Sequence, residues 1–380
     1  MYIERLPSKQ IASHLVSSSK VIILYGPRQV GKTTLINHIL KGSPLRTLKI
    51  DADESKHLDI LGSKDVEKIR SFTSGYDLLV IDEAQQIPHI GTNLKLIHDH
   101  ISEIKVMVTG SSSFNLSNKV TEPLTGRYWS YELFPISFSE LKGTMNENEL
   151  NNQLEDRLIY GSYPELFQIQ SYDERKKHLN NLCNSYLFKD VLKIAQIRNS
   201  EKLRDLLKLL AFQMGNEVSL SELGSIIGMS KDTIAHYIDL LEKSYVLFRL
   251  RGLSRNLRKE VSKMDKIYFY DLGIRNSIID MVKPLGERND VGQLWENFLI
   301  VERMKHNAYQ QEQTTPYFWR LHTGAELDYV EEVSGQLNGY EFKWGSKNAK
   351  CPKSWSSTYP KSTFKTINRD NYLSFIINEK

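Results

Sequence analysis

The stretch VIILYGPRQVGKTTL, residues 21–35, decides the fold of the first part of the chain. It begins with an apolar and largely branched run from Val21 to Tyr25, which is typical of a buried strand. The run from Gly26 to Thr33 then fits the pattern G-x-x-x-x-G-K-[ST], and a helical stretch follows through Leu40. A strand, a glycine-rich loop and a helix in this order predict a phosphate-binding loop, the Walker A motif.

The residue types of this loop suit a nucleoside triphosphate. Gly26 and Gly31 let the backbone turn tightly, so that its N–H groups point at phosphate oxygens. Lys32 places a charge on the β- and γ-phosphates, Thr33 offers its hydroxyl to Mg²⁺, and the following helix adds its positive end. We therefore predict ATP and Mg²⁺ as cofactors, bound by a loop that comprises Gly26, Pro27, Arg28, Gln29, Val30, Gly31, Lys32, Thr33 and Thr34.

A second motif, YDLLVIDEAQQIP, covers residues 76–88. Its apolar run from Leu78 to Ile81 predicts another buried strand. Asp82 and Glu83 follow at the carboxyl edge of the sheet, where open α/β sheets bind their ligands. We expect Asp82 to hold the Mg²⁺ through water, as a Walker B aspartate does. Glu83 is then placed as the general base that polarises the attacking water.

Two further polar positions are candidates for the hydrolytic site. Thr109 and Ser111 lie at the tip of the predicted strand IKVMVTGSSSF, residues 104–114, where either could orient the attacking water. A plain Ser/Gly turn is the alternative. Arg127 follows Gly126 at a predicted helix-to-strand transition, where its guanidinium could reach a γ-phosphate. In a ring it would do so in the neighbouring subunit, as an arginine finger. A surface ion pair explains Arg127 equally well.

Length and composition exclude several classes of protein. A chain of 380 residues accommodates about two to four domains. No apolar run approaches the roughly 20 residues that span a bilayer, so we expect no membrane partner. The N-terminal MYIERLPSKQ lacks the apolar core of a secretion signal. Cys183 and Cys351 can build neither a disulfide framework nor a cysteine-based zinc site. We therefore expect a cytoplasmic protein.

The middle of the chain predicts helices. From about Glu147 to Met214 the pattern is helical and is expected to form a lid and linker. One helix there has an apolar face of Leu203, Leu206, Leu207 and Leu210. Residues 216–250 then predict two short helices around Gly228, which is the signature of a helix-turn-helix. Ser219-x-x-Glu222 forms a capping box for the first of them. The apolar face of this helix comprises Leu220, Leu223, Ile226 and Ile227.

The second of these helices begins after Ser230, a predicted cap, and YVLFRL then predicts the first wing strand of a winged helix. Its outward positions, available to a DNA groove, are Lys231, Asp232, Thr233 and His236. Packing or a protein contact is the alternative.

Two basic stretches favour a polyanionic partner, although a solvated basic face is also open. Arg249 to Lys266 carries seven Lys or Arg against two acids, and Phe342 to Ile367 carries six lysines and no acid, with interleaved aromatic residues.

The stretch AELDYVEEVSGQLNGYEFKW, residues 325–344, predicts a hairpin. If Ser334-Gly335 is a two-residue turn, facing residues have numbers that sum to 669. Asp328 then faces Glu341, Glu326 faces Lys343, and all four side chains share one face of the sheet. The opposite, apolar face comprises Leu327, Tyr329, Tyr340, Phe342 and Trp344. Paired carboxylates suit Mg²⁺, and a nearby lysine suits phosphate chemistry. A solvated charged face is the alternative.

Several of these motifs together resemble one family of prokaryotic AAA-type ATPases, whose C-terminal region resembles the PD-(D/E)XK nucleases. The resemblance spans nearly the whole chain and rests on GPRQVGKTTL, LLVIDEAQQIP, VTGSSSF, LTGRYWSYELFPISFSEL, IYGSYPEL, YLFKDV, KIYFYDLGIR, GQLWENFL and AELDYV. It implies an ASCE-type sheet and a D…E-x-K core formed by Asp328, Glu341 and Lys343. Glu296 matches the helical acid of that metal site. No proline precedes Asp328, which departs from the family signature.

We therefore expect an α/β protein with an AAA-type parallel sheet, a helical and winged-helix module and a restriction-endonuclease-like domain. The predicted domains are residues 1–145, 146–214, 215–262 and 263–380. The predicted function is Mg²⁺-dependent ATP hydrolysis coupled to DNA binding, with DNA cleavage left open. At the nuclease-like site Mg²⁺ or Mn²⁺ is expected. The alternative is an ATP-dependent molecular switch whose C-terminal half only binds protein or DNA. A homo-oligomeric ring is the arrangement in which Arg127 would act in trans.

Overall fold

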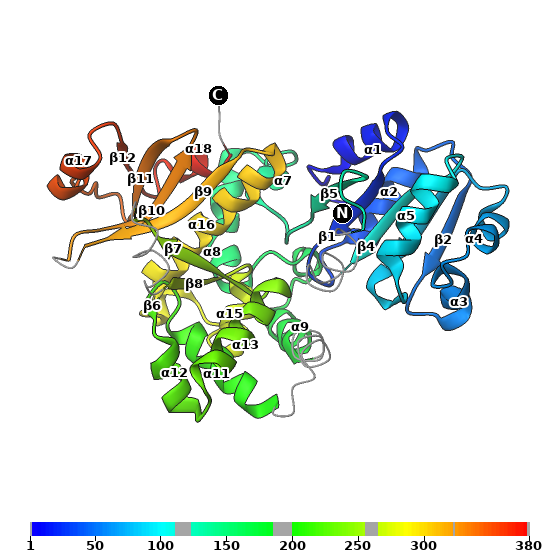
Figure 1. Cartoon of the computed structure of the whole chain (residues 1–380). Helices are drawn as coiled ribbons and strands as arrows, with labels where there is room; N and C mark the ends of the chain where they lie inside the picture. The colour runs from blue at the N-terminus through cyan, green and yellow to red at the C-terminus, as the bar shows by residue number, and fades with distance from the viewer. Residues whose placement is uncertain (1, 111–122, 185–199, 255–264, 322–323, 378–380) are drawn as a thin grey trace. The chain divides into compact units, whose positions relative to one another are not determined.

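The computed structural model describes residues 2–110, 123–184, 200–254, 265–321 and 324–377. The chain divides into two compact units (Figure 1). The N-terminal unit comprises Tyr2–Pro135 together with Lys243–Tyr245. The C-terminal unit comprises Ile136–Glu242 and Val246–Lys380. No helix in the described ranges is both long enough and apolar enough to cross a membrane.

The described part of the N-terminal unit contains a five-stranded parallel sheet in the order β2-β3-β4-β1-β5. The predicted parallel α/β fold is therefore confirmed for this unit. The apolar runs of both Walker motifs form buried strands inside the sheet. The strands are β1 (Val21–Tyr25), β2 (Thr47–Asp51), β3 (Leu78–Asp82), β4 (Lys105–Gly110) and β5 (Tyr128–Glu132).

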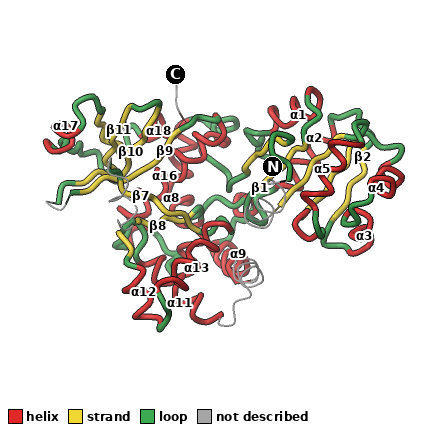
Figure 2. The backbone as a smooth tube through the Cα atoms, viewed as in Figure 1, coloured by secondary structure: helices red, strands yellow, loops and turns green. Residues whose placement is uncertain are grey.

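Short helices connect these strands, as the red segments of Figure 2 show. Helix α2 begins at Lys32, directly after the phosphate-binding loop, and helix α4 is capped by the carboxylate of Asp65. The helices are α1 (Ser8–Ser17), α2 (Lys32–Lys41), α3 (Leu58–Leu61), α4 (Val66–Thr73) and α5 (Ile90–His100), with the 3₁₀ turns η1 (Ser55–His57) and η2 (Ala84–Gln86).

The C-terminal unit combines helices with a second sheet. Helix α11 buries its predicted leucine face, with Leu203, Leu206, Leu207 and Leu210 each at most 1% exposed. The helices are α7 (Phe138–Leu141), α8 (Glu147–Tyr160), α9 (Tyr172–Leu182), α11 (Ser200–Phe212), α12 (Leu220–Ile227), α13 (Lys231–Lys243), α15 (Leu272–Ile278), α16 (Val291–Gln310), α17 (Lys353–Thr358) and α18 (Tyr372–Ile377), with η4 (Pro164–Phe167) and η6 (Leu285–Glu287).

The second sheet has seven strands within the described residues, in the order β12-β11-β10-β9-β7-β8-β6. Strands β7 and β8 form an antiparallel pair, and β7 also pairs in parallel with β9 through Arg251 and Gly252. The strands after α11 and those of the C-terminal hairpin are thereby joined in one continuous sheet. The strands are β6 (Glu217–Val218), β7 (Leu247–Gly252), β8 (Asp265–Phe269), β9 (Thr314–Arg320), β10 (Glu326–Val333), β11 (Gln336–Phe342) and β12 (Thr363–Ile367).

The two helices predicted around Gly228 are α12 and α13. Gly228 ends α12 in the left-handed conformation, with a φ of 70°, and the Ser230 hydroxyl accepts a hydrogen bond from the Thr233 N–H at 3.1 Å. The prediction that Ile226 belongs to the packed apolar face of α12 is wrong, because its side chain is 58% exposed. In α12 the buried positions are Leu223 and Gly224, and Ile226 lies about 100° around the helix from the half-buried Ile227.

The predicted register of the hairpin is confirmed. Strand β10 pairs with β11 from Tyr329–Tyr340 to Val333–Gln336, and the residue numbers of every pair in this range sum to 669 around the Ser334-Gly335 turn. Ser334 and Gly335 have φ angles of 49° and 82°, as a type I′ turn requires. Strand β10 contains an irregularity between Leu327 and Val330 in its pairing with β9.

That irregularity makes one predicted face assignment wrong. Leu327 packs with Val330 and Leu337, which share the face expected for the acids, instead of with the opposite aromatic face. A bulge shifts the two-residue alternation of side chains, which explains the change. The aromatic face itself is present, because Tyr329, Tyr340 and Phe342 all pack against Phe375 of α18.

Two of the motifs shared with the resembling family, IYGSYPEL and KIYFYDLGIR, pack against each other. A Cβ on Gly161 would lie 2.0 Å from an Asp271 carboxylate oxygen, and a Cβ on Gly273 would lie 1.9 Å from the Tyr160 carbonyl oxygen. The Asp271 carboxylate accepts hydrogen bonds from the Ser162 N–H at 2.6 Å and the Ile274 N–H at 3.1 Å. These glycines therefore allow α8 and α15 to approach closely.

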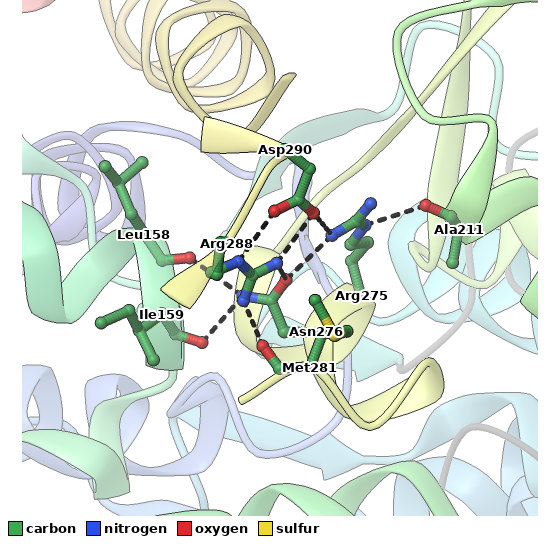
Figure 3. A network of polar contacts seen from close by, with 8 residues as sticks. All are labelled: Leu158, Ile159, Ala211, Arg275, Asn276, Met281, Arg288 and Asp290. Carbon is green, nitrogen blue, oxygen red and sulfur yellow. Dashed lines mark hydrogen bonds and ion pairs between the residues drawn. The ribbon is translucent and has the colours of Figure 1, made fainter. Parts of the chain in front are cut away.

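A polar clamp of Arg275, Asn276, Arg288 and Asp290 strengthens the same junction (Figure 3). The Asn276 side-chain amide donates to the Leu158 and Ile159 carbonyl oxygens at the end of α8, both at 2.9 Å. Arg275 and Arg288 both donate to the carboxylate of Asp290. Arg275 also donates to the Ala211 carbonyl oxygen of α11 at 2.9 Å, so the clamp ties three helices together.

Candidate functional sites

The phosphate-binding loop has the backbone that its glycines predict. Gly26 has a φ of 150°, and a Cβ at this position would lie 2.2 Å from the Leu133 carbonyl oxygen. Gly31 has a φ of 93° and forms the N-cap of α2, so the helix begins with the lysine of the motif. Gln29 also has a positive φ, of 61°. Close packing and positive φ angles therefore explain both glycines of the motif.

Lys32 lies within this loop and is 6% exposed. Its ammonium donates to the carbonyl oxygens of Gly26 and Pro27, each at 2.9 Å. These two bonds hold the charge inside the curve of the loop, where the predicted phosphates would lie.

Thr33 and the second motif are brought together as the sequence predicts. The Thr33 hydroxyl donates to Oδ2 of Asp82 at 2.6 Å. The buried Thr109 hydroxyl donates to the other carboxylate oxygen of Asp82 and accepts the Glu83 N–H at 3.0 Å. In this arrangement the Thr109 hydroxyl holds the acidic pair through the Asp82 side chain and the Glu83 backbone. Ser111, the other candidate on this strand, lies outside the described residues.

Glu83 has a left-handed backbone, with a φ of 52°. Its carboxylate accepts a hydrogen bond from the side-chain amide of Gln85. A non-glycine residue with this backbone conformation is uncommon and is found often at functional sites. Gln85 is a contact that sequence reasoning missed, although it lies two residues after Glu83 in the same motif.

Arg127 lies away from this group of residues. Its Nε donates to the Asp99 carboxylate at 2.8 Å, and hydrogen bonds from Arg127 and then His98 lower the pKa of Asp99 to about 2. Arg127 precedes β5, and its carbonyl oxygen accepts the N–H of Val21 at the amino end of β1. The phosphate-binding loop follows the carboxyl end of β1, about 13 Å away at 3.3 Å per residue. The register therefore argues against action on the nucleotide of its own subunit.

The oxygen donors of Thr33 and Asp82 fit a Mg²⁺ ion bound beside a triphosphate, because a hydroxyl and a carboxylate are ligands that Mg²⁺ prefers. In P-loop enzymes such an ion bridges the β- and γ-phosphates and offsets their charge. Across the described ranges, no group of three or more His, Cys, Asp or Glu side chains is arranged to hold a metal ion. A magnesium ion at this loop would therefore depend on nucleotide oxygens and water.

Comparison with known proteins agrees with this geometry. Residues 18–142 match the model of an AAA domain. The chain therefore contains an AAA-type P-loop ATPase domain. Residues 151–285 match a domain of unknown function (DUF8612), and residues 291–370 match another (DUF4143). The regions outside the ATPase domain therefore correspond to families whose function is not described.

Relatives of the ATPase are found in bacteria and archaea. An uncharacterized protein of Mycobacterium tuberculosis is 28% identical over 90% of this chain and 74% of its own length. An uncharacterized protein of Methanocaldococcus jannaschii is 23% identical over 82% of this chain and 72% of its own. A Walker-type ATPase of Pyrococcus abyssi has a similar structure, with a TM-score of 0.51 and 14% identity over 73% of this chain and 96% of that chain.

The C-terminal unit of the ATPase contains a carboxylate cluster, which we define as Glu296, Glu326, Asp328 and Glu341. Glu296 comes from α16, and the others come from the hairpin β10–β11. Burial and the negative charges of Glu296 and Glu341 raise the pKa of Asp328 to about 8. Burial, and to a smaller extent Glu326, also raises the pKa of Glu296. These influences show that the predicted residues share one electrostatic environment.

Each member of the carboxylate cluster also contacts a donor from the protein. Glu341 pairs with Lys343 at 2.7 Å, and Asp328 accepts the Phe342 N–H at 2.7 Å. Glu326 lies 3.7 Å from Arg320, with both side chains exposed. Glu296 accepts the Tyr268 hydroxyl at 2.5 Å and lies 3.4 Å from the Lys266 ammonium. The carboxylates are thus turned towards protein donors, which explains why they do not form a ready metal cage.

Sequence reasoning missed Lys266 and Tyr268 as parts of this cluster. Both lie on β8, outside the hairpin. They are two positions apart along the strand, so their side chains share one face. Tyr268 is fully buried and Lys266 is 6% exposed. The lysine beside the apolar run of KIYFY was a signal that could have indicated Lys266, because a lysine in a buried strand requires a negatively charged partner.

The basic stretch after the hairpin is partly available to a partner. Its exposed lysines are Lys347, Lys350, Lys353, Lys361 and Lys365. The interleaved aromatic residues contribute mainly to packing, since Trp355 is 1% exposed and Trp344 packs edge-to-face on Trp295 at 5.4 Å. Most of the other basic stretch, residues 255–264, lies outside the described residues.

Proposed function

We propose that this ATPase couples ATP hydrolysis to DNA through its C-terminal unit. In this proposal α12, α13 and the β7–β8 pair act as a winged helix, and α16 with the hairpin β10–β11 acts as a PD-(D/E)XK nuclease-like core. The observation that carries the proposal is the shared environment of Asp328, Glu341 and Glu296, in which burial and then the charges of Glu296 and Glu341 raise the pKa of Asp328 to about 8. Clustered carboxylates with a neighbouring lysine suit a cation and a phosphodiester.

The proposed metal ligands in the C-terminal unit are Glu296, Asp328 and Glu341, and the ion is Mg²⁺ or Mn²⁺. These residues supply only oxygen donors, as a hard divalent cation prefers. Their present bonds to Lys266, Phe342 N–H and Lys343 imply that the carboxylates turn towards the ion when it binds. Lys343 would then be released to face the phosphate.

DNA would contact exposed basic side chains of the C-terminal unit. Lys347, Lys350 and Lys353 lie in the segment after β11, and all three are exposed. On α13, Lys231, Asp232 and His236 are exposed and face away from the core, whereas Thr233 is half-buried. A row of such cations would bind the phosphate backbone and release its counterions.

In the ATPase domain we propose that Thr33 and Asp82 hold Mg²⁺ and that Glu83 acts as general base. Thr109 then positions the acidic pair through its hydroxyl. We propose that Arg127 acts in trans, because its place at the amino end of β5 leaves a neighbouring subunit as the site it could reach. This requires a homo-oligomer, for which a ring is the arrangement expected in the resembling family. The cytoplasmic location stays a prediction.

Incubation of the protein with plasmid and oligonucleotide DNA, Mg²⁺ or Mn²⁺, and with or without ATP tests the proposal. We expect metal-dependent cleavage by the wild type and none by Asp328→Ala, which should keep its ATPase activity because Asp328 lies outside the ATPase domain. The exposed Asp370→Ala provides a matched control. Cleavage that survives Asp328→Ala would come from a contaminant and would refute the site.

The alternative function is a switch in which the C-terminal unit only binds a partner. Two large apolar side chains favour it, because Phe212 of α11 is 63% exposed and Ile226 of α12 is 58% exposed. These side chains lie on helices that contact each other, and a contiguous apolar surface is typical of a protein contact. Absence of cleavage under every condition above, together with ATP-dependent binding of DNA or protein, would support this function instead.

A further inference from the structure

Among the described residues, three members of the carboxylate cluster pair with cations, and one of these cations differs from the others. Lys343 and Arg320, the partners of Glu341 and Glu326, have side chains that are 43% and 47% exposed. Lys266, the partner of Glu296, has a side chain that is 8% exposed. Water screens the first two charges, whereas it screens the third much less.

Lys266 also lacks the flexibility of a surface lysine. It lies on β8, where Lys266 is paired with Leu250 on one side and with Glu217 on the other. Its ammonium lies 5.4 Å from the centre of the Phe318 ring and 3.4 Å from Oε1 of Glu296. A buried ammonium is stable only with a close negative partner, so Lys266 depends on Glu296.

Tyr268 fixes the other member of this pair. Its hydroxyl donates to Oε1 of Glu296, the same oxygen that faces Lys266, at 2.5 Å. The charges of Lys266 and Glu296 both act on Asp328, in opposite directions. The Lys266 ammonium thus contacts Glu296 directly and also acts on Asp328 through its charge.

We propose that Lys266 is the built-in counter-ion of Glu296 and that it competes with a divalent cation for the carboxylate cluster. Tyr268 acts as a positioning residue that holds Glu296 beside Lys266. The inference rests on the proposed metal site. It adds that β8, a strand outside the hairpin, controls how strongly that site binds its ion.

Binding of Mn²⁺ to the full chain without nucleotide tests this inference, with free Mn²⁺ measured by electron paramagnetic resonance. Each variant is compared with the same variant carrying Asp328→Ala, so that ions bound by the ATPase domain are subtracted. We expect Lys266→Met to bind Mn²⁺ about tenfold more tightly than the wild type, because a nearby positive charge is removed from a poorly screened site. Lys266→Gln tests the same point if the methionine variant does not fold.

Two controls separate charge from packing. Lys266→Arg keeps the positive charge and should bind Mn²⁺ as the wild type does, within about twofold. Lys208→Met removes an exposed lysine of α11 in the same unit and should have no effect. If Asp328-dependent binding is unchanged or weaker in Lys266→Met and Lys266→Gln, the inference about Lys266 is overturned, whereas the proposed metal site is retained. No Asp328-dependent binding in any variant would refute the proposed metal site itself.

Discussion

At the scale of single residues, the acidic pair after β3 is held by polar contacts from two other elements. The Thr33 hydroxyl from α2 and the Thr109 hydroxyl from β4 donate to opposite oxygens of Asp82. Thr109 also accepts the N–H of Glu83. The two acids consequently have different roles. Asp82 is bonded on both oxygens, whereas Glu83 has a carboxylate that contacts Gln85 and can turn towards water.

We predict that Glu83→Gln binds ATP with its affinity retained and hydrolyses it at least about 100-fold more slowly, because the base is removed and the Mg²⁺ ligands remain. Lys32→Ala should instead lose tight ATP binding, since the buried ammonium inside the loop is gone. Fluorescent nucleotide binding and phosphate release measure the two effects. Glu103→Gln, on the segment before β4, is a matched control. Equal turnover by wild type and Glu83→Gln would disprove the assignment.

The Walker residues could be predicted from sequence one by one, because phosphate geometry fixes their spacing along a single strand, loop and helix. Lys266 and Tyr268 could not, since they reach Glu296 across about 30 positions through the packing of α16 on β8, which local pattern does not specify. Glu331 is another example. It is 1% exposed and paired with Arg303 at 2.9 Å, although its sequence neighbourhood resembles a charged surface strand.

At the scale of elements, the hairpin shows where pattern reasoning holds and where it fails. The turn and its two-residue alternation fixed the register from Tyr329 to Val333, because both signals are local. The displacement of Leu327 was not predictable, since the irregularity arises in the pairing of β10 with β9, whose register depends on the whole sheet. The prediction for Ile226 was wrong for a related reason, because packing against α11 selects which side of the short helix α12 is buried.

The polar clamp holds the end of α8 beside α15 in the C-terminal unit. Asn276 binds the last carbonyl oxygens of α8, and Asp290 holds the two arginines beside it. Burial raises the pKa of Asp290, but hydrogen bonds from Arg288 and Arg275 outweigh it and lower the pKa to about 2 from an ordinary 3.8. The clamp therefore stabilises the fold of the C-terminal unit.

We predict that Asp290→Asn destabilises the C-terminal unit in a pH-dependent way. A depressed folded-state pKa stabilises the fold above the unfolded pKa, and this contribution, about 2 kcal/mol, is lost as pH falls from about 4 to 2. The difference in unfolding free energy between wild type and variant should therefore be constant above about pH 5 and shrink below it. Urea unfolding across this range measures it, with the exposed Asp205→Asn as control. A difference that does not change with pH would contradict the ion-pair explanation.

At the scale of the whole molecule, the position of Arg127 predicts how neighbouring subunits would interact. The proposed nucleotide site of the ATPase domain lies at the carboxyl ends of β1 and β3, whereas Arg127 lies at the amino end of β5. An assembly in which one subunit presents its β5 end to the nucleotide of the next would link neighbouring subunits through ATP. Communication between subunits is then a consequence of where this arginine lies.

We predict that Arg127→Ala and Glu83→Gln proteins, each inactive alone, recover ATPase activity when mixed. At a mixed interface, the Arg127→Ala subunit supplies an intact Glu83 and its neighbour supplies an intact Arg127, so that one complete site forms. Activity should rise with the mixing ratio and be highest near equal amounts. Light scattering on the same samples reports whether an assembly forms.

A structural role for Arg127 gives a different result, and Asp99→Asn distinguishes the two. If Arg127 serves only its ion pair with Asp99, the two single variants should lose activity to a similar extent, because each breaks the same 2.8 Å contact. If Arg127 acts on the neighbouring nucleotide, Asp99→Asn should keep most of its activity, since the guanidinium is still present and is freed from its partner. No recovery in the mixtures, together with equal losses in Arg127→Ala and Asp99→Asn, would make Arg127 a residue of the ATPase surface.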